Sequence, residues 1–214
     1  MKKEITFILE HDNGKLTTEV SGIPTDLLID LRDDLGTSQN LNCGKPIGGE
    51  SWEPGFSKDD RHYLWLHRIY HNSVVDGPGR RSVIQVAGCS IRCPGCYVPE
   101  THSRHNGKQV SISSVLDEIL SRCHENDGVT ILGGEPFDQS NSVAELVLRL
   151  KSYNFHIVVY TGYTSEQLIA KGDFDIRYII SHIDTLIDGP FDSSLVFETG
   201  EYRGSSNQRL LQQR

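Results

Sequence analysis

The chain has no long apolar run. None of its hydrophobic stretches approaches the roughly 18 consecutive apolar residues that a membrane-spanning helix requires. Its first residues, Met1–Thr6, include two lysines and a glutamate and lack the apolar stretch of a secretory signal peptide. These absences predict a cytoplasmic protein without a membrane partner.

Positive charge is also scarce. The sequence holds 21 lysine and arginine residues against 29 aspartate and glutamate residues, which gives a formal net charge of −8. This balance argues against general binding to nucleic acids or acidic membrane surfaces. Internal repeats and low-complexity segments are absent as well. The length of 214 residues is enough for one sizeable domain, or for a domain with a small appendage.

Cysteine is rare, with five residues in the whole chain. In a cytoplasmic protein thiols stay reduced, so clustered cysteines bind metals or act in catalysis more often than they form disulfides. Two of the five stand alone. Cys123 closes an amphipathic segment and is expected to be a buried apolar filler, whereas Cys43 is expected to be structural or a free thiol.

The other three cysteines, Cys89, Cys93 and Cys96, follow the spacing C-x-x-x-C-x-x-C. A cubane iron–sulfur cluster needs four thiolates to be fully ligated, so three leave one iron open, as in reactive rather than structural metal sites. The alternative is a structural zinc site, to which His102 or His105 would add the fourth ligand, or three unconnected buried thiols. The spacing favours the cluster.

A second motif, Gly133-Gly134-Glu135-Pro136, comes directly after a short apolar run. The two glycines permit close approach of a ligand to the backbone, and Glu135 can accept a hydrogen bond from an ammonium group. A plain turn between a strand and a helix is the competing interpretation, because glycine pairs are common there.

The first 60 residues indicate a small accessory module and a linker. An Asn-Gly turn between the β-rich runs 5–9 and 16–20 predicts a hairpin. A helix is expected over residues 24–36. This order is similar to the β-grasp start of a plant-type ferredoxin, but one cysteine cannot hold a two-iron cluster. We therefore expect a β-grasp-like α+β module over residues 1–60 and the main domain over residues 61–214.

The main domain alternates strands with helices. Strands are expected at 81–87, 129–132, 156–160 and 185–187, and helices at 112–123, at 140–151 and shortly after residue 164. This alternation predicts an α/β fold with a parallel sheet covered by helices. Roughly 150 residues are too few for a complete eight-fold barrel, so a partial, open βα barrel is expected.

Together these motifs resemble the radical S-adenosylmethionine (radical SAM) superfamily, and residues 69–211 are similar to the activating proteins of anaerobic ribonucleoside-triphosphate reductase. The segments that carry the resemblance are Asn72–Arg80, Cys89–Tyr97, Gly133–Pro136, Thr161–Tyr163, Asp188–Phe191 and Arg203–Gln208. The first 60 residues have no counterpart in the minimal members of that family. Many superfamily members carry an aromatic residue directly before the third cysteine, where this chain has Gly95.

The resemblance implies a set of cofactors and site residues. Cys89, Cys93 and Cys96 would hold a [4Fe-4S] cluster, with S-adenosylmethionine on the open iron. The residues implied in binding S-adenosylmethionine are Gly95, Cys96, Tyr97, Gly133, Gly134, Glu135 and Thr161. No side chain is expected to act as a conventional acid, base or nucleophile.

The resemblance implies an activase that cleaves S-adenosylmethionine to a 5′-deoxyadenosyl radical and so generates a glycyl radical on a large partner enzyme, similar to anaerobic ribonucleotide reductase. An external low-potential donor would supply the electron. The alternative is a radical SAM enzyme that acts on a small molecule or peptide. A third hypothesis, an iron–sulfur electron carrier, is disfavoured because a carrier has no need for the Gly133–Pro136 motif.

Overall fold

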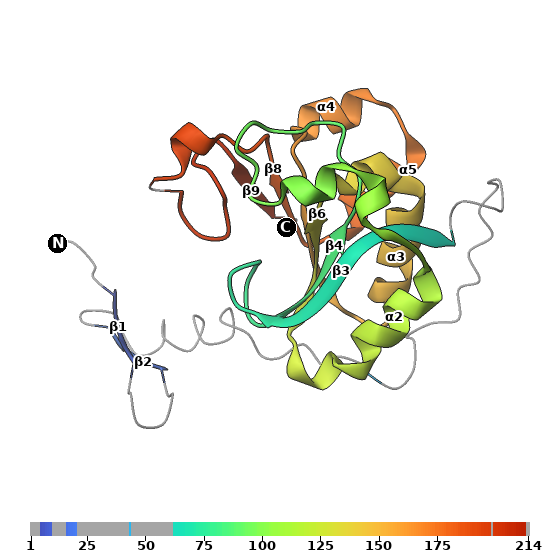
Figure 1. Ribbon diagram of the computed structural model, residues 1–214. Coiled ribbons are helices and arrows are strands. Elements are labelled where there is room, and N and C mark those ends of the chain that lie inside the picture. Colours follow the sequence, from blue (N-terminus) through green and yellow to red (C-terminus); the bar gives the residue numbers. More distant parts are fainter. Residues whose placement is uncertain (1–4, 10–15, 21–42, 44–61, 198, 213–214) are drawn as a thin grey trace. The chain divides into compact units, whose positions relative to one another are not determined.

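The computed structural model describes residues 5–9, 16–20, 43, 62–197 and 199–212 (Figure 1). Its contacts separate Met1–Gln39 from Asn40–Arg214, and each unit is considered by itself. In the first unit, β1 (Ile5–Leu9) pairs antiparallel with β2 (Leu16–Val20), which confirms the predicted hairpin. The turn between these strands and the helix expected at 24–36 lie outside the described residues.

A seven-stranded sheet in the order β5-β3-β4-β6-β7-β8-β9 is the centre of the second unit. Four neighbouring strands run parallel, as predicted from their apolar runs, namely β4 (Arg81–Val86), β6 (Gly128–Gly133), β7 (His156–Tyr160) and β8 (Thr185–Asp188). Because consecutive strands are parallel and adjacent, their carboxyl ends lie along one edge of the sheet.

The sheet is mixed, which corrects the expectation of a parallel sheet. Three antiparallel strands complete it, namely β3 (Tyr63–Ser73), β5 (Lys108–Ser111) and β9 (Arg209–Gln212). Strand β3 connects directly to β4, and two register shifts interrupt their pairing. Strand β9 pairs with the last parallel strand, so β8 is not the final strand of the chain.

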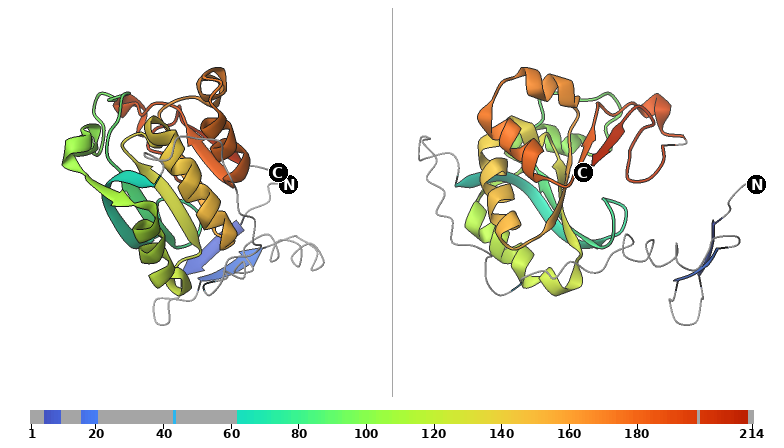
Figure 2. Two further views of the ribbon diagram at one scale, coloured as in Figure 1. Left: turned by 90° about the vertical axis from the view of Figure 1, so that its right-hand side faces the viewer. Right: turned by 180° about the vertical axis from the view of Figure 1, so that it is seen from behind.

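Helices cover one face of this sheet (Figures 1 and 2). They are α2 (Ile112–Ser121), α3 (Ser140–Ser152), α4 (Ser165–Ala170) and α5 (Phe174–His182). The side chain of Ser111 caps α2, and Thr164 forms a capping box with Gln167 at the start of α4. None of the helices among the described residues is long and apolar enough to cross a bilayer.

The hydrophobic core lies between the helices and this face of the sheet. Its fully buried members include Ile84, Ile131 and Ile157 from the parallel strands. The helices contribute the side chains that the 3.6-residue period predicts, among them Ile119 from α2 and Leu146 from α3. This burial fixes the positions of the strands and therefore of the loops that follow them.

Arg81 links the amino ends of the parallel strands through hydrogen bonds, and it is 1% exposed. Its guanidinium donates hydrogen bonds to Thr130 Oγ1 (3.1 Å) and to the carbonyls of Val129 (2.5 Å), His156 (2.9 Å) and Pro78 (3.4 Å). Burial lowers its pKa to about 10, so the group is still charged at neutral pH. A buried charge of this kind is stable because its donors are paired.

A disulfide joins Cys43 to Cys123, which lies in the 3₁₀ turn η3 (Cys123–Glu125) just before β6. Cys123 is buried in the core, as expected, but it is not a simple apolar filler. The sequence could not show this pairing, because the two residues are 80 positions apart. The predicted domain boundary near residue 60 lies outside the described residues.

Candidate functional site

Four loops meet at the carboxyl ends of the parallel strands and enclose a cavity of about 120 Å³. The loop after β4 contributes Cys89, Cys93 and Cys96 to its lining. The other walls come from the ends of β6 and β7, from the loop after β8 and from the residue before β9. In parallel sheets this edge is where ligands gather, and the fold therefore brings the predicted cysteines and the predicted glycine motif together.

The cysteine loop begins at Gly88, which has φ +99°. Its N–H donates to the carbonyl of Thr101 (2.7 Å), and the N–H of Cys89 donates to the carbonyl of His102 (3.1 Å). The loop also needs Gly95, because φ is +74° there and an added Cβ would lie 2.8 Å from Ser193 Cβ. All three cysteines of the loop are free and partly buried.

Two thiols of this loop, those of Cys89 and Cys93, face backbone N–H groups. Burial raises the pKa of Cys89, and the opposing effect comes from the N–H groups of Arg92 and Ile91. Burial likewise raises the pKa of Cys93, and a hydrogen bond from the N–H group of Phe191 lowers it in part. The raised pKa values favour the protonated thiols of Cys89 and Cys93, and a bound metal would displace these protons and use the same N–H groups as donors to the thiolates.

The glycine pair at the end of β6 is required by the neighbouring strand. A Cβ on Gly134 would lie 2.2 Å from the carbonyl oxygen of Gly88, and one on Gly133 would lie 2.4 Å from Gln85 Cγ. The N–H of Glu135 then donates to Gly88 O (2.7 Å). This tight packing gives the pair a structural reason beyond the ligand approach expected from the sequence, and it places Glu135 next to the cysteine loop.

Glu135 is 1% exposed and joins two strand ends. Its Oε1 accepts hydrogen bonds from Phe137 N (3.0 Å) and Thr161 Oγ1 (2.9 Å), and its Oε2 accepts one from Gly162 N (2.9 Å). Burial raises the pKa of Glu135 to about 7, although these three donors oppose the rise. Thr161 follows β7, so the carboxyl group fixes the end of β7 against the end of β6.

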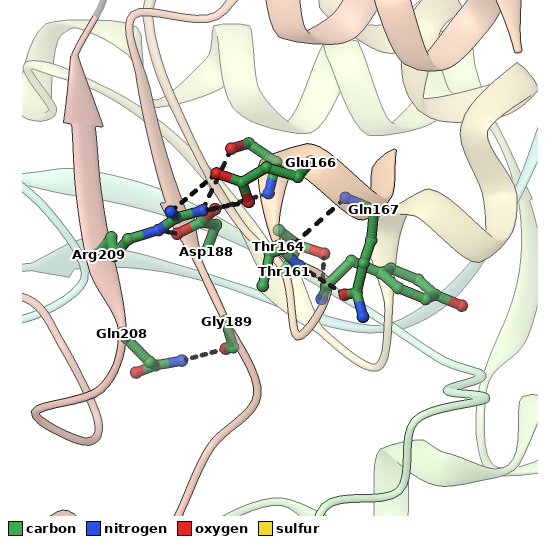
Figure 3. A network of polar contacts seen from close by, with 10 residues as sticks. Thr161, Thr164, Glu166, Gln167, Asp188, Gly189, Gln208 and Arg209 are labelled. Carbon is green, nitrogen blue, oxygen red and sulfur yellow. Dashed lines mark hydrogen bonds and ion pairs between the residues drawn. The ribbon is translucent and has the colours of Figure 1, made fainter. Parts of the chain in front are cut away.

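The wall near β9 is held by a network around Asp188 (Figure 3). Arg209 on β9 donates to both carboxyl oxygens of Asp188 (2.9 and 2.5 Å) and to Glu166 on α4 (2.9 and 2.8 Å). The preceding residue, Gln208, donates to the carbonyl of Gly189 (3.0 Å) and lines the cavity. The network therefore keeps the start of β9 at the cavity.

A second brace holds the cysteine loop from outside. Asp138, in the 3₁₀ turn η4 (Pro136–Gln139), accepts from Ser90 N (2.7 Å) and Ser90 Oγ (2.9 Å). The hydroxyl of Tyr163 donates to Asp138 Oδ1 (3.2 Å) and lies 2.9 Å from Ser90 Oγ. The residue after Cys89 is thus tied to the ends of two other strands.

The structure brings together most of the predicted site residues, with two exceptions. The cavity lining contains Cys89, Cys93, Cys96, Gly133, Gly134, Glu135 and Thr161. Gly95 and Tyr97 belong to the same loop but do not line the cavity. The Tyr97 side chain is 68% exposed, and its ring centroid lies 4.6 Å from that of Phe191.

Other lining residues were not identified as site residues from the sequence. Tyr160, Phe191 and Gln208 line the cavity, and His102, considered before only as a zinc ligand, lines it as well. Phe191 and Gln208 stand in segments that carry the family resemblance, which was the available signal. Their convergence depends on the pairing of β8 with β9.

The residues present fit a multinuclear cluster better than one zinc ion. Thiolates on one tetrahedral zinc lie about 4 Å apart, because each Zn–S bond is about 2.3 Å long. Within the described part of the chain, the group whose ligand atoms all lie within 4.8 Å of one another is Cys43, Cys123 and His124, not the cysteines of the loop. Their wider spread suits a cubane, in which each thiolate binds a different iron.

The family of 4Fe-4S single cluster domains matches residues 75–211. Curated relatives match over a similar range. The anaerobic ribonucleoside-triphosphate reductase-activating protein of Vibrio cholerae is 33% identical over 150 residues, which cover 66% of this chain and 94% of that protein. The protein of the same name from Escherichia coli is 32% identical over 150 residues with the same coverage. That of Enterobacteria phage T4 is 33% identical over 149 residues, covering 67% of this chain and 90% of its own.

Proposed function

This chain belongs to the family of 4Fe-4S single cluster domains and to that of the anaerobic ribonucleoside-triphosphate reductase-activating proteins, and from this premise we propose that it is a radical SAM activase. Its partner in this proposal is a large glycyl-radical enzyme of the anaerobic ribonucleotide reductase type. An external low-potential donor supplies the electron. The proposal places the chain in the cytoplasm and takes its sheet as the open, partial barrel of radical SAM proteins.

The convergence of four loops on one cavity carries this proposal. Cys89, Cys93 and Cys96 would hold a [4Fe-4S] cluster beside the carboxyl group of Glu135 and the backbone of Gly134. When bound, the cluster and S-adenosylmethionine together supply one-electron cleavage of a sulfonium carbon–sulfur bond, which yields methionine and the 5′-deoxyadenosyl radical that takes a hydrogen atom from a glycine of the partner.

Glu135 is suited to the ammonium group of S-adenosylmethionine. An ionised carboxylate has about four acceptor sites, and the described hydrogen bonds use two on Oε1 and one on Oε2. One site on Oε2 is therefore left for the ammonium group. Since burial raises the pKa of Glu135 to about 7, a neighbouring cation would favour its ionised form.

The remaining walls position the ligand and exclude water. The hydroxyl of Tyr160 donates to the carbonyl of Tyr202 (2.6 Å), and Tyr160 lines the cavity together with Phe191. No residue of the cavity is required as an acid, base or nucleophile. The task of the protein is orientation, in keeping with the hydrogen-bonded braces around Glu135 and Ser90.

The test is anaerobic reconstitution of the full chain with iron and sulfide, followed by dithionite and S-adenosylmethionine. We expect release of 5′-deoxyadenosine, and a glycyl-radical EPR signal when the glycyl-radical protein from the same cell is added. Cleavage that responds only to a small molecule or peptide would favour the alternative enzyme. A reducible cluster without any cleavage would leave an electron carrier and contradict the proposal.

Two single cysteine substitutions, one inside the loop and one outside it, give this test a matched control. Cys93→Ala should remove the cluster absorbance and lower 5′-deoxyadenosine formation by more than about 100-fold, because two thiolates cannot hold the cubane. Cys43→Ala, which removes a cysteine outside the loop, should keep both. Turnover retained by Cys93→Ala would refute the assignment of the three ligands.

A further inference from the structure

His102 lies beside the first cysteine of the loop. It ends the 3₁₀ turn η1 (Pro99–His102), and its carbonyl accepts the hydrogen bond from Cys89 N (3.1 Å). The preceding carbonyl, that of Thr101, accepts from Gly88 N (2.7 Å). Two consecutive backbone hydrogen bonds therefore fix the position of His102 relative to Cys89, and His102 lines the cavity together with the three cysteines.

The Nε2 atom of His102 is buried and has no hydrogen-bond partner among the described residues. Leaving a buried donor or acceptor unpaired costs about 1–3 kcal/mol, so such groups are rare and call for an explanation. The site offers a contrast, because the buried carboxyl of Glu135 has three donors. Elsewhere, both ring nitrogens of His71 have partners, Ser82 and Glu118.

We propose that His102 is a positioning residue whose Nε2–H donates a hydrogen bond to a sulfur of the bound cluster. This inference rests on the cluster of the proposed function and adds a residue that the ligand set does not include. The N–H group finds its partner only when the cluster is present, which explains why no residue in the described part of the chain pairs with it. A hydrogen bond to cluster sulfur stabilises the more negative, reduced state and so raises the reduction potential.

The imidazole of His102 could take two roles beside the cluster, that of a hydrogen-bond donor and that of an iron ligand. As a hydrogen-bond donor, His102 leaves the fourth iron open for S-adenosylmethionine. As an iron ligand, it would close that position and leave the protein with a fully ligated cluster. The two roles differ in the coupling between imidazole nitrogen and the cluster, and this coupling can be measured.

The first measurement is an EPR-monitored redox titration of the reconstituted full chain, without S-adenosylmethionine. We expect His102→Leu to shift the midpoint potential to more negative values and His102→Gln, whose side chain keeps an N–H donor, to restore part of the shift. His105→Leu is the matched control, since His105 is exposed in the neighbouring turn η2 (Arg104–Asn106), and it should leave the potential unchanged. Equal potentials in wild type and His102→Leu would overturn the proposal.

The second measurement needs no variant and covers the case in which His102→Leu assembles no cluster. Wild-type protein labelled with ¹⁵N-histidine should show a weak nitrogen coupling in ENDOR spectra of the reduced cluster, as expected across a hydrogen bond. A strong coupling typical of direct ligation, or no coupling at all, would overturn the proposal.

The outcomes also distinguish this inference from the proposed function. If the wild type assembles no cluster, both fail together. Another outcome is that the wild type cleaves S-adenosylmethionine normally, while His102→Leu has the wild-type potential and the spectra show no nitrogen coupling. In that case only the role of His102 fails. A shift that appears only after S-adenosylmethionine is added would place the hydrogen bond on that ligand and would also contradict the proposal.

Discussion

At the amino ends of the parallel strands, the chain buries the charged group of Arg81 and pairs it with its own carbonyls and with Thr130. At the carboxyl ends it leaves polar groups for something else to pair with. Three cysteines are free there, and Nε2 of His102 has no partner within the described residues. Both ends belong to the same four strands. At the amino ends the paired groups are strand residues, whereas at the carboxyl ends the unpaired groups stand in the loop that follows β4.

The two ends of the parallel strands have different roles in the protein. A buried polar group whose partners come from the protein contributes to a stable end of the sheet, and its loss should appear in the free energy of unfolding. A buried polar group that is left unpaired at the carboxyl ends lowers the stability of the ligand-free protein. It contributes to binding when a ligand supplies its hydrogen-bond partner. The Cys43–Cys123 disulfide, next to the start of β6, falls on the stabilising side.

The strongest test of the amino end is Arg81→Met. The substitution leaves the carbonyls of Val129 and His156 without their donor, so we expect the free energy of unfolding to fall by about 4 kcal/mol in urea titrations. Cleavage of S-adenosylmethionine per folded molecule should stay close to that of the wild type. Arg80→Met, at the exposed neighbouring position, is the control and should change stability by less than about 0.5 kcal/mol. An Arg81→Met variant that is as stable as the wild type but impaired in cleavage would contradict the assignment of Arg81 to stability and not to ligand binding.

The disulfide gives a smaller effect that depends on redox state. Cys43→Ser should lower the free energy of unfolding of the oxidised protein by about 3 kcal/mol, because the bond closes a long loop in the unfolded chain. A thiol reductant should lower the stability of the wild type by a similar amount and leave the variant unchanged. Five reactive thiols in the cluster-free, unreduced wild type would show that the bond does not form.

At the carboxyl end, Glu135→Gln tests the cost of a group that is poised for a ligand. Because burial raises the pKa of Glu135 to about 7, the folded state holds its proton more tightly than the unfolded state does. The stability of the cluster-free wild type relative to Glu135→Gln is therefore highest below about pH 4.5 and falls by about 2–3 kcal/mol as the pH rises to about 7. Urea titrations across this range measure the difference. A constant difference would mean that the carboxyl group is not destabilised by burial.

The sequence predicted the elements whose burial follows a simple period. The strands β4, β6 and β7 and the helices α2 and α3 were placed correctly because apolar residues recur continuously or at helical spacing. Strand β3 was missed because polar residues and two register shifts break its alternation. Strand β9 was missed because it is short and mostly exposed and is defined by its pairing with β8. Helix α5 was missed although Asp173 caps it, since few of its side chains are fully buried.

The site divides in the same way. The thiols and the Gly133–Pro136 motif could be found because their chemistry depends on residues close in sequence. Gln208 and His102 could not be assigned their places, because these arise where β9 and the turn η1 reach the carboxyl ends of other strands. The partner of Cys43 was hidden for the same reason.

In the proposed site, three cysteines hold the cluster and leave one iron free for S-adenosylmethionine. This arrangement is tested most directly by Mössbauer and EPR spectra of the anaerobically reconstituted chain, recorded before and after S-adenosylmethionine is added. We expect a [4Fe-4S] centre in which one iron differs from the other three and changes its signal when S-adenosylmethionine binds. Four equivalent, unresponsive irons, or a preparation that takes up no iron, would contradict it.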